Sequence, residues 1–195
     1  MPKIVDPEFE KNNIILAFER CCQSTPITSV TVRAIAKEAG ISHSKIFSYF
    51  SSKDEIIASY AKYIADIYSR SFEGVVKKAI FKTDDKKELL QSIISELYEV
   101  DQQNTVEKLY AQIYVLGQYN EDMYRVVLDA YSDWRQSLTH MLQRIYPNIE
   151  DSFARSILVL VEGILIYRMN DALSKEEAQQ IITDLFIPNP DIVNN

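Results

Sequence analysis

Apolar side chains recur every three or four residues along most of this 195-residue chain, which is the spacing of one face of an α-helix. The runs with this spacing lie at 8–23, 54–80, 86–100, 105–117, 121–146 and 151–172. Only four Gly and six Pro interrupt the chain, and few stretches alternate apolar with polar residues as a half-buried strand does. The pattern therefore predicts an all-α protein with long helices.

Residues 31–50 depart from this pattern, because two short helices stand where the chain elsewhere builds long ones. Thr31 is a good N-cap for the first short helix, Gly40 supplies the turn, and Ser42 caps the second, which carries Ile46, Phe47 and Phe50. Two short helices joined by a Gly-containing turn form a helix-turn-helix, whose second helix enters the major groove of DNA. An ordinary helical corner with a polar surface has the same pattern.

Two capping boxes mark further helix starts, one at Ser52 with Glu55 and one at Ser174 with Glu177. In a capping box the hydroxyl accepts from the later backbone N–H, and the carboxylate accepts from the earlier one. The first box begins the helix that continues to about residue 80, and the second begins a last helix to about residue 186. The chain thus reads as three short helices followed by a larger helical bundle.

The net charge of −7 is unevenly distributed. Residues 1–53 contain seven basic and five acidic residues, whereas the other 142 residues contain 14 basic and 23 acidic ones. A small DNA-facing unit on an acidic body is compatible with this distribution.

Several classes of protein are not supported by the sequence. The apolar run at 157–167 is interrupted by Glu162-Gly163 and is far shorter than the roughly 20 residues that span a bilayer. The start of the chain lacks the apolar segment of a signal peptide, so we expect a cytoplasmic protein without a membrane partner. Neither a phosphate loop nor the motif of a serine hydrolase or zinc protease occurs, and His140 has no second ligand at metal spacing. We therefore expect no enzyme, no cofactor and no metal.

The sequence of residues 31–42, TVRAIAKEAGIS, continued by IFSYFSSKDE at 46–55, resembles the tetracycline-repressor (TetR) family of bacterial regulators. The close resemblance covers roughly residues 12–57. It implies about nine helices in a homodimer, with a DNA-binding domain at 1–52 and a ligand-binding and dimerisation domain at 53–195. The chain departs from the family pattern at Pro26, Ser44, Lys45 and Phe47, and these departures bear on the operator sequence.

The resemblance also implies which residues face DNA. Arg33 lies where the family can place a base-contacting side chain, although it can also be an ordinary solvated Arg. Three further positions are base-facing, namely His43, Ser44 and Lys45. Those that match phosphate-facing or groove-edge positions are Thr31, Ser48, Tyr49 and Lys53, and Ser42 also belongs to the DNA-facing set.

The later helices carry candidates for a ligand site and a dimer interface. Aromatic residues with a polar handle suit a pocket, and those on the bundle helices are Tyr98, Tyr110, Tyr114, Tyr131 and Trp134. Each of them can instead be an ordinary core or surface residue. The run at 157–167 is more apolar than one core face requires, which indicates an interface that includes Leu158, Glu162, Ile164 and Leu165. Glu162 can alternatively anchor a ligand.

Together these features predict a repressor that a small-molecule inducer, apolar or aromatic, releases from a pseudo-palindromic operator in double-stranded DNA. One alternative is a DNA-binding regulator without an inducer. Another is an α-helical ligand carrier or enzyme that does not bind DNA.

Overall fold

The computed structural model describes residues 6–82, 85, 88–89, 92, 104–148, 150–169, 172–174, 176–177, 180–181 and 184. Within these ranges every regular element is a helix, in agreement with the all-α prediction. The elements are α1 (Pro7–Cys22), the 3₁₀ helix η1 (Ile27–Ser29), α2 (Val32–Glu38), α3 (His43–Ile46), α4 (Lys53–Lys82), α6 (Asn104–Gly117), α7 (Glu121–Ile145) and α8 (Asp151–Met169). The helices predicted at 86–100 and 174–186 lie largely outside the described residues.

The chain forms two compact units. The first unit comprises Met1–Ile64 and Thr105–Ala130, and the second comprises Ala65–Asn104 and Tyr131–Asn195. Both α4 and α7 therefore contribute residues to each unit. The functional division into domains 1–52 and 53–195 stays a prediction.

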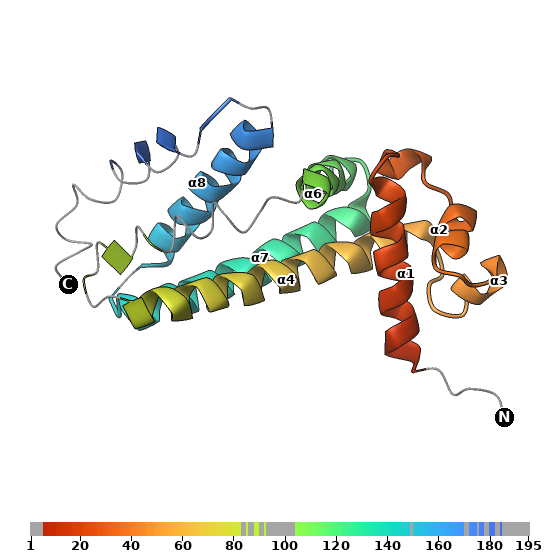
Figure 1. Ribbon diagram of the computed structural model, residues 1–195, viewed down its shortest axis with the longest axis horizontal. Coiled ribbons are helices and arrows are strands. Elements are labelled where there is room, and N and C mark those ends of the chain that lie inside the picture. The colour runs from red at the N-terminus through yellow and green to blue at the C-terminus, as the bar shows by residue number, and fades with distance from the viewer. Residues whose placement is uncertain are drawn as a thin grey trace. The chain divides into compact units, whose positions relative to one another are not determined.

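The core of the first unit holds the three N-terminal helices together. Helix α1 packs on α2, and α2 packs on α3 (Figure 1). Ile14 from α1, Ile35 from α2 and Ile46 from α3 are all fully buried, and each contributes roughly 1.5–3 kcal/mol through its burial. Phe18 of α1 meets Tyr60 of α4 edge to face, with ring centroids 5.3 Å apart.

The predicted N-caps at Thr31 and Ser42 are confirmed. The Thr31 hydroxyl accepts from the backbone N–H of Ala34 at 3.1 Å, and the Ser42 hydroxyl accepts from that of Lys45 at 3.2 Å. Between the two helices Gly40 has a φ of 70°, a left-handed conformation that residues with a Cβ adopt at a cost. Local hydrogen bonds thus begin each short helix, and the left-handed glycine separates them.

The second short helix is shorter than predicted, because α3 ends at Ile46. The backbone N–H groups of Ser48 and Tyr49 bond to carbonyls three residues earlier, which tightens the chain into 3₁₀-like turns. As a result Phe50 turns into the core, whereas half of the Phe47 side chain stays exposed.

The two capping boxes differ in the hydrogen bond that the glutamate carboxylate accepts. At Ser174 both predicted bonds form, at 3.2 Å from the Glu177 N–H to the hydroxyl and at 2.8 Å from the Ser174 N–H to the carboxylate. At Ser52 only the hydroxyl bond forms as predicted, because the Glu55 carboxylate accepts instead from the N–H and hydroxyl of Ser51. These bonds from Ser51 lower the pKa of Glu55.

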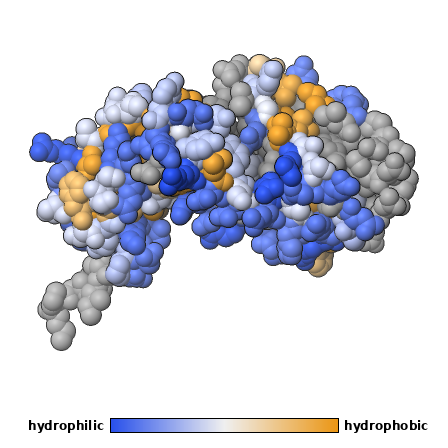
Figure 2. Space-filling model, turned by 180° about the vertical axis from the view of Figure 1, so that it is seen from behind, coloured by the Kyte–Doolittle hydropathy of each residue, from blue (hydrophilic) through white to orange (hydrophobic). Residues whose placement is uncertain are grey.

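In the second unit, α8 buries one face and exposes another. Ile164 is buried within the protomer, whereas Val159 is 72% exposed and Tyr167, two helical turns further along, is also exposed. Figure 2 shows hydrophobic surface gathered toward the upper right of the face that it draws. Glu162 is half-buried, and the side chains of Leu158 and Leu165 lie outside the described set. The predicted dimer interface stays a prediction.

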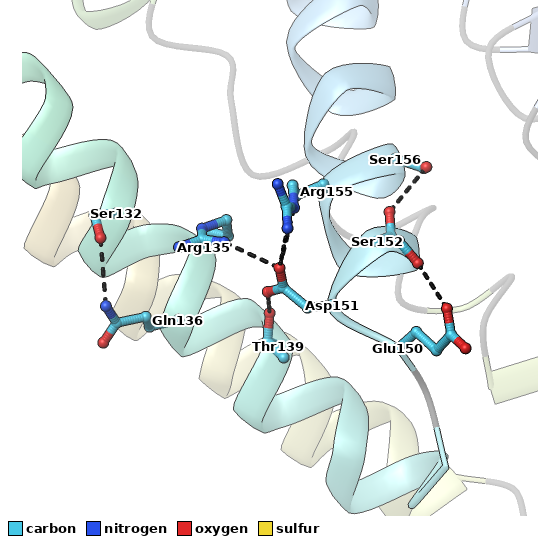
Figure 3. Close-up of polar contacts among 9 residues, drawn as sticks. All are labelled: Ser132, Arg135, Gln136, Thr139, Glu150, Asp151, Ser152, Arg155 and Ser156. Atoms are coloured by element: carbon cyan, nitrogen blue, oxygen red, sulfur yellow. Dashed lines mark hydrogen bonds and ion pairs between the residues drawn. The ribbon is translucent and has the colours of Figure 1, made fainter.

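A polar cluster joins α7 to the start of α8 (Figure 3). The Asp151 carboxylate accepts from Arg135 of α7 at 3.0 Å and from Arg155 of α8, whose Nη2 lies 2.7 Å away. The Thr139 hydroxyl donates to its other oxygen at 3.4 Å. Desolvation opposes these interactions, but the hydrogen bond from Arg155 and the two guanidinium charges leave the pKa of Asp151 lowered.

Candidate nucleic-acid interface

One side of α1 positions the helix-turn-helix through three polar contacts, and we call Glu10, Asn13 and Arg20 the polar face of α1. The Asn13 amide donates to the carbonyl of Ala39 at the end of α2, at 3.0 Å. Arg20 pairs with Glu38 of α2 at 2.6 Å, and Glu10 pairs with Lys45 of α3 at 3.2 Å. Because these contacts reach α2, the turn region and α3, they fix both short helices relative to α1.

Three of the predicted DNA-facing hydroxyls make local hydrogen bonds. Thr31 and Ser42 accept from backbone N–H groups as N-caps, and the Ser44 hydroxyl lies 3.1 Å from that of Ser42. All three residues are exposed, and a hydroxyl that accepts one bond keeps a proton to donate. The Thr31 hydroxyl, and one of the two hydroxyls of the Ser42–Ser44 pair, therefore keep a proton to donate to a phosphate or a base.

Both predicted lysines contact the protein itself. The Lys45 ammonium lies 3.2 Å from Glu10, and the Lys53 ammonium donates to the carbonyl of Thr28 in η1 at 3.2 Å. Desolvation by burial lowers the pKa of Lys53. The helix-turn-helix region therefore has fewer free positive charges than its sequence indicates.

The other four predicted side chains have no hydrogen bond or ion pair with any described residue. Arg33, His43 and Ser48 are exposed, and Tyr49 is half-buried. The His43 ring meets Phe47 edge to face, with centroids 5.1 Å apart. These side chains are available to a ligand at the surface of α2 and α3.

Two further residues belong to this surface, although neither was among the predicted DNA-facing residues, and Phe47 was named only as a departure from the family pattern. Lys37 is exposed four residues after Arg33, so both cations lie on one face of α2. That spacing was the signal that could have found Lys37. Phe47 is 50% exposed although it is apolar, and no local pattern distinguished it from the buried Ile46 and Phe50.

Other candidate chemistry in the described residues is limited. Cys21 and Cys22 are free, and burial raises the pKa of Cys22 to about 12. In the described part of the chain no three His, Cys, Asp or Glu residues lie close enough to hold a metal. None of the helices in that part is both long and apolar enough to cross a membrane.

The predicted ligand residues are divided between the two units. Tyr110 and Tyr114 lie on α6 in the first unit, and Tyr131 and Trp134 lie on α7 in the second. Tyr114 is exposed, the other three are half-buried, and Tyr98 lies outside the described residues. The ligand site stays a prediction.

Comparison with known proteins identifies the helix-turn-helix. Residues 14–60 match the family model described as "Bacterial regulatory proteins, tetR family". The chain is similar to the HTH-type transcriptional regulator PksA of Bacillus subtilis, at 23% identity over 93% of this chain and 90% of that protein. It is also similar to the regulator BetI 1 of Chromohalobacter salexigens, at 25% identity over 84% and 81% of the two chains.

Solved structures share the fold. A TetR transcription regulator from Haloarcula marismortui superposes with a TM-score of 0.72, at 19% identity over 91% of this chain and 96% of that one. A protein from Saccharomonospora viridis, crystallised in complex with choline, gives 0.70, at 18% identity over 93% and 97%. The family model and the curated relatives go further than the fold: residues 14–60 form a helix-turn-helix of the tetR family of bacterial regulatory proteins, as the resemblance of residues 31–55 predicted. Over most of its length the chain is similar to helix-turn-helix transcriptional regulators.

Proposed function

We propose that the chain acts as a dimeric repressor and that a small molecule releases it from its operator. Two heads, one from each protomer, would bind half-sites about one helical turn, 34–36 Å, apart on a pseudo-palindromic DNA. Residues 1–52 would supply each head, and residues 53–195 the dimer contacts and ligand site. A DNA-bound regulator of this kind would act in the cytoplasm.

The observation that carries the proposal is the surface of α2 and α3. Arg33, Lys37 and His43 are exposed there without a polar partner among the described residues, on helices anchored by buried isoleucines. Arg can bridge two acceptors of guanine, and lysine supplies charge to the phosphates. The core fixes the backbone, so these groups can meet the groove without prior folding.

The inducer is proposed because aromatic residues of α6 and α7 are half-buried, namely Tyr110, Tyr131 and Trp134. Aromatic faces bind apolar or aromatic ligands and also quaternary ammonium groups. The choline complex of the Saccharomonospora viridis protein supports small-molecule binding by this fold. Moving a population from 99:1 to 1:99 needs about 5.5 kcal/mol of differential binding. One hydrogen bond contributes about 1 kcal/mol, so several contacts must act together.

Selection from random double-stranded DNA, followed by footprinting, tests the DNA-binding function. We expect a two-fold symmetric site whose halves are protected together by one dimer. The variant Arg33→Ala/His43→Ala should lose this site, whereas Arg70→Ala/His140→Ala, which changes the same residue types at exposed positions on α4 and α7, should keep it. Selection of no sequence would favour the carrier or enzyme alternative.

The inducer is tested by titrating small aromatic molecules and quaternary ammonium compounds into the operator complex. Release of DNA, together with a change in the fluorescence of Trp134 over the same concentrations, is the expected result. Operator binding that no compound reverses would favour the alternative of a regulator without an inducer.

A further inference from the structure

Glu10 of α1 is a buried acid in a part of the molecule that must approach a polyanion. Glu10 is only 8% exposed, and in the part of the chain that the structure describes no other charged residue is buried. One carboxylate oxygen, Oε1, lies 3.2 Å from the Lys45 ammonium. The other, Oε2, is buried without a hydrogen-bond partner among the described residues.

This burial makes Lys45 necessary to the protein itself. A carboxylate removed from water is costly unless a cation compensates it, and removing one partner of such a pair leaves an uncompensated charge. A lysine that left Glu10 to reach a guanine would create that situation. The burial of Glu10 therefore favours an ammonium that stays paired with α1, although the Lys45 side chain is itself partly exposed.

The Lys45–Glu10 pair also fixes the orientation of α3. A helix of four residues has too few internal hydrogen bonds to hold its own direction. Its buried side chain Ile46 anchors one point, and the Lys45–Glu10 pair supplies a second, to a helix 35 positions earlier in the chain. His43 and Ser44 stand immediately before Lys45, so their aim depends on this second anchor.

We propose that Glu10 and Lys45 are positioning residues for operator recognition: the pair fixes the direction of α3, and neither side chain contacts DNA. The proposal rests on the DNA-binding function proposed above and alters one part of it, the base-facing role that the sequence assigned to Lys45. Glu10 thereby becomes a determinant of specificity from outside the helix-turn-helix.

The salt dependence of operator binding separates a positioning lysine from one that contacts DNA. Each phosphate neutralised by a cation contributes about 0.9 to the slope of log K against log salt concentration. Lys45→Met should lower operator affinity about tenfold, a size typical of residues coupled in one ion pair, and leave this slope unchanged. Lys37→Met, at the exposed lysine of α2, provides the matched control, and it should reduce the slope by about 1 if it contacts phosphate.

Glu10→Gln changes operator binding in opposite directions under the two hypotheses, long-range electrostatics alone and the positioning role of the pair. Loss of a negative charge strengthens binding to DNA if only long-range electrostatics matter. The proposal expects a weaker preference for operator over random DNA, by about tenfold, because Lys45 loses its anchor. Lys45→Arg should keep wild-type preference, and Glu10→Gln/Lys45→Met should bind better than Lys45→Met alone, since the double variant buries no unpaired acid.

Circular dichroism melts establish which variants are folded before affinity is compared. If Lys45→Met does not fold, Glu10→Gln and Lys45→Arg decide the question. An operator preference in Glu10→Gln equal to or above that of the wild type would overturn the proposal, as would a slope reduced by Lys45→Met. A wild-type chain that bound no DNA would remove the proposed function and this proposal with it. If the wild-type chain binds its operator and Glu10→Gln binds it equally well, this proposal alone is removed and the proposed function stands.

Discussion

His43 and Phe47 form a small aromatic surface at the exposed side of α3. Their rings meet edge to face at 5.1 Å, and half of Phe47 is exposed. An imidazole can donate to or accept from a base edge, and an apolar ring can contact the methyl group of thymine. Lys45 is paired with Glu10, so His43 and Phe47 are the main candidates for direct base contact in and just after α3.

Replacing His43 by Ala should weaken operator binding by roughly 1–3 kcal/mol, the contribution of one good base contact. The fold should not change, since the side chain is exposed and has only the Phe47 ring as a described partner. Fluorescence anisotropy with labelled operator measures the effect. The control is His140→Ala, at the other histidine of the chain, which is exposed on α7. Equal affinity for both variants would show that His43 faces away from the bases.

The residues that could be predicted from sequence are those whose roles depend on near neighbours. Thr31 and Ser42 cap their helices through bonds that span three residues, and the sequence shows such spacings directly. The partner of Lys45 could not be predicted, because Glu10 lies on another helix and an acid near a DNA-binding head suggests a solvated surface. The outward turn of Phe47 depends on where α3 ends, which propensities locate poorly.

At the scale of elements, the start of α4 shows how two serines share one glutamate. The Ser52 hydroxyl caps the helix, and Glu55 reaches past it to the N–H and hydroxyl of Ser51 at 2.6 and 2.7 Å. The carboxylate thus holds the loop that leaves α3 against the first turn of α4. The junction between α3 and α4 is thus held by two interactions, the Ser52 cap and the bonds from Ser51 to Glu55.

Ser52→Ala should destabilise the first unit by about 1 kcal/mol, the usual contribution of an N-cap. Thermal melting followed by circular dichroism measures the loss. Ser24→Ala, at an exposed serine after α1, serves as the control and should melt like the wild type. A melting temperature unchanged by Ser52→Ala would mean that the Glu55 carboxylate alone holds this turn.

The Asp151 cluster should give the α7–α8 junction a dependence on pH. Since the folded-state pKa of Asp151 is lowered, its ionised form stabilises the fold above the unfolded pKa of about 4. That stabilisation is lost as the pH falls through the lower, folded value. Asp151→Asn should therefore melt earlier than wild type at pH 7, and the difference should shrink at pH 3.

Asp133→Asn, at an exposed aspartate of α7, is the control for this experiment and should follow the wild type at both pH values. A difference between Asp151→Asn and wild type that stayed constant from pH 7 to 3 would exclude the charge of Asp151 as its cause.

At the scale of the molecule, helical periodicity predicted the order of the long helices that the structure describes, but not the division into compact units. The bounds of α7 and α8 follow from apolar spacing within each helix, a local property. The first unit, in contrast, joins residues 1–64 to α6 and the start of α7, through contacts such as the Gln112 side chain accepting from the Ile27 N–H at 3.0 Å. Contacts across 85 positions leave no periodic trace in a single sequence.

The surface of α8 provides the test of dimerisation. Ile164 is already buried in the protomer, so a charge there would disturb the fold itself. Val159 is 72% exposed, so a charge there disturbs only a partner. We expect Val159→Arg to sediment as a folded monomer and to bind operator much more weakly, because a single head loses the second half-site. The matched control is Phe81→Arg, at a side chain on α4 that is 95% exposed, and it should remain a dimer. A dimer that persists in Val159→Arg and dissociates in Phe81→Arg would move the interface from α8 to the end of α4.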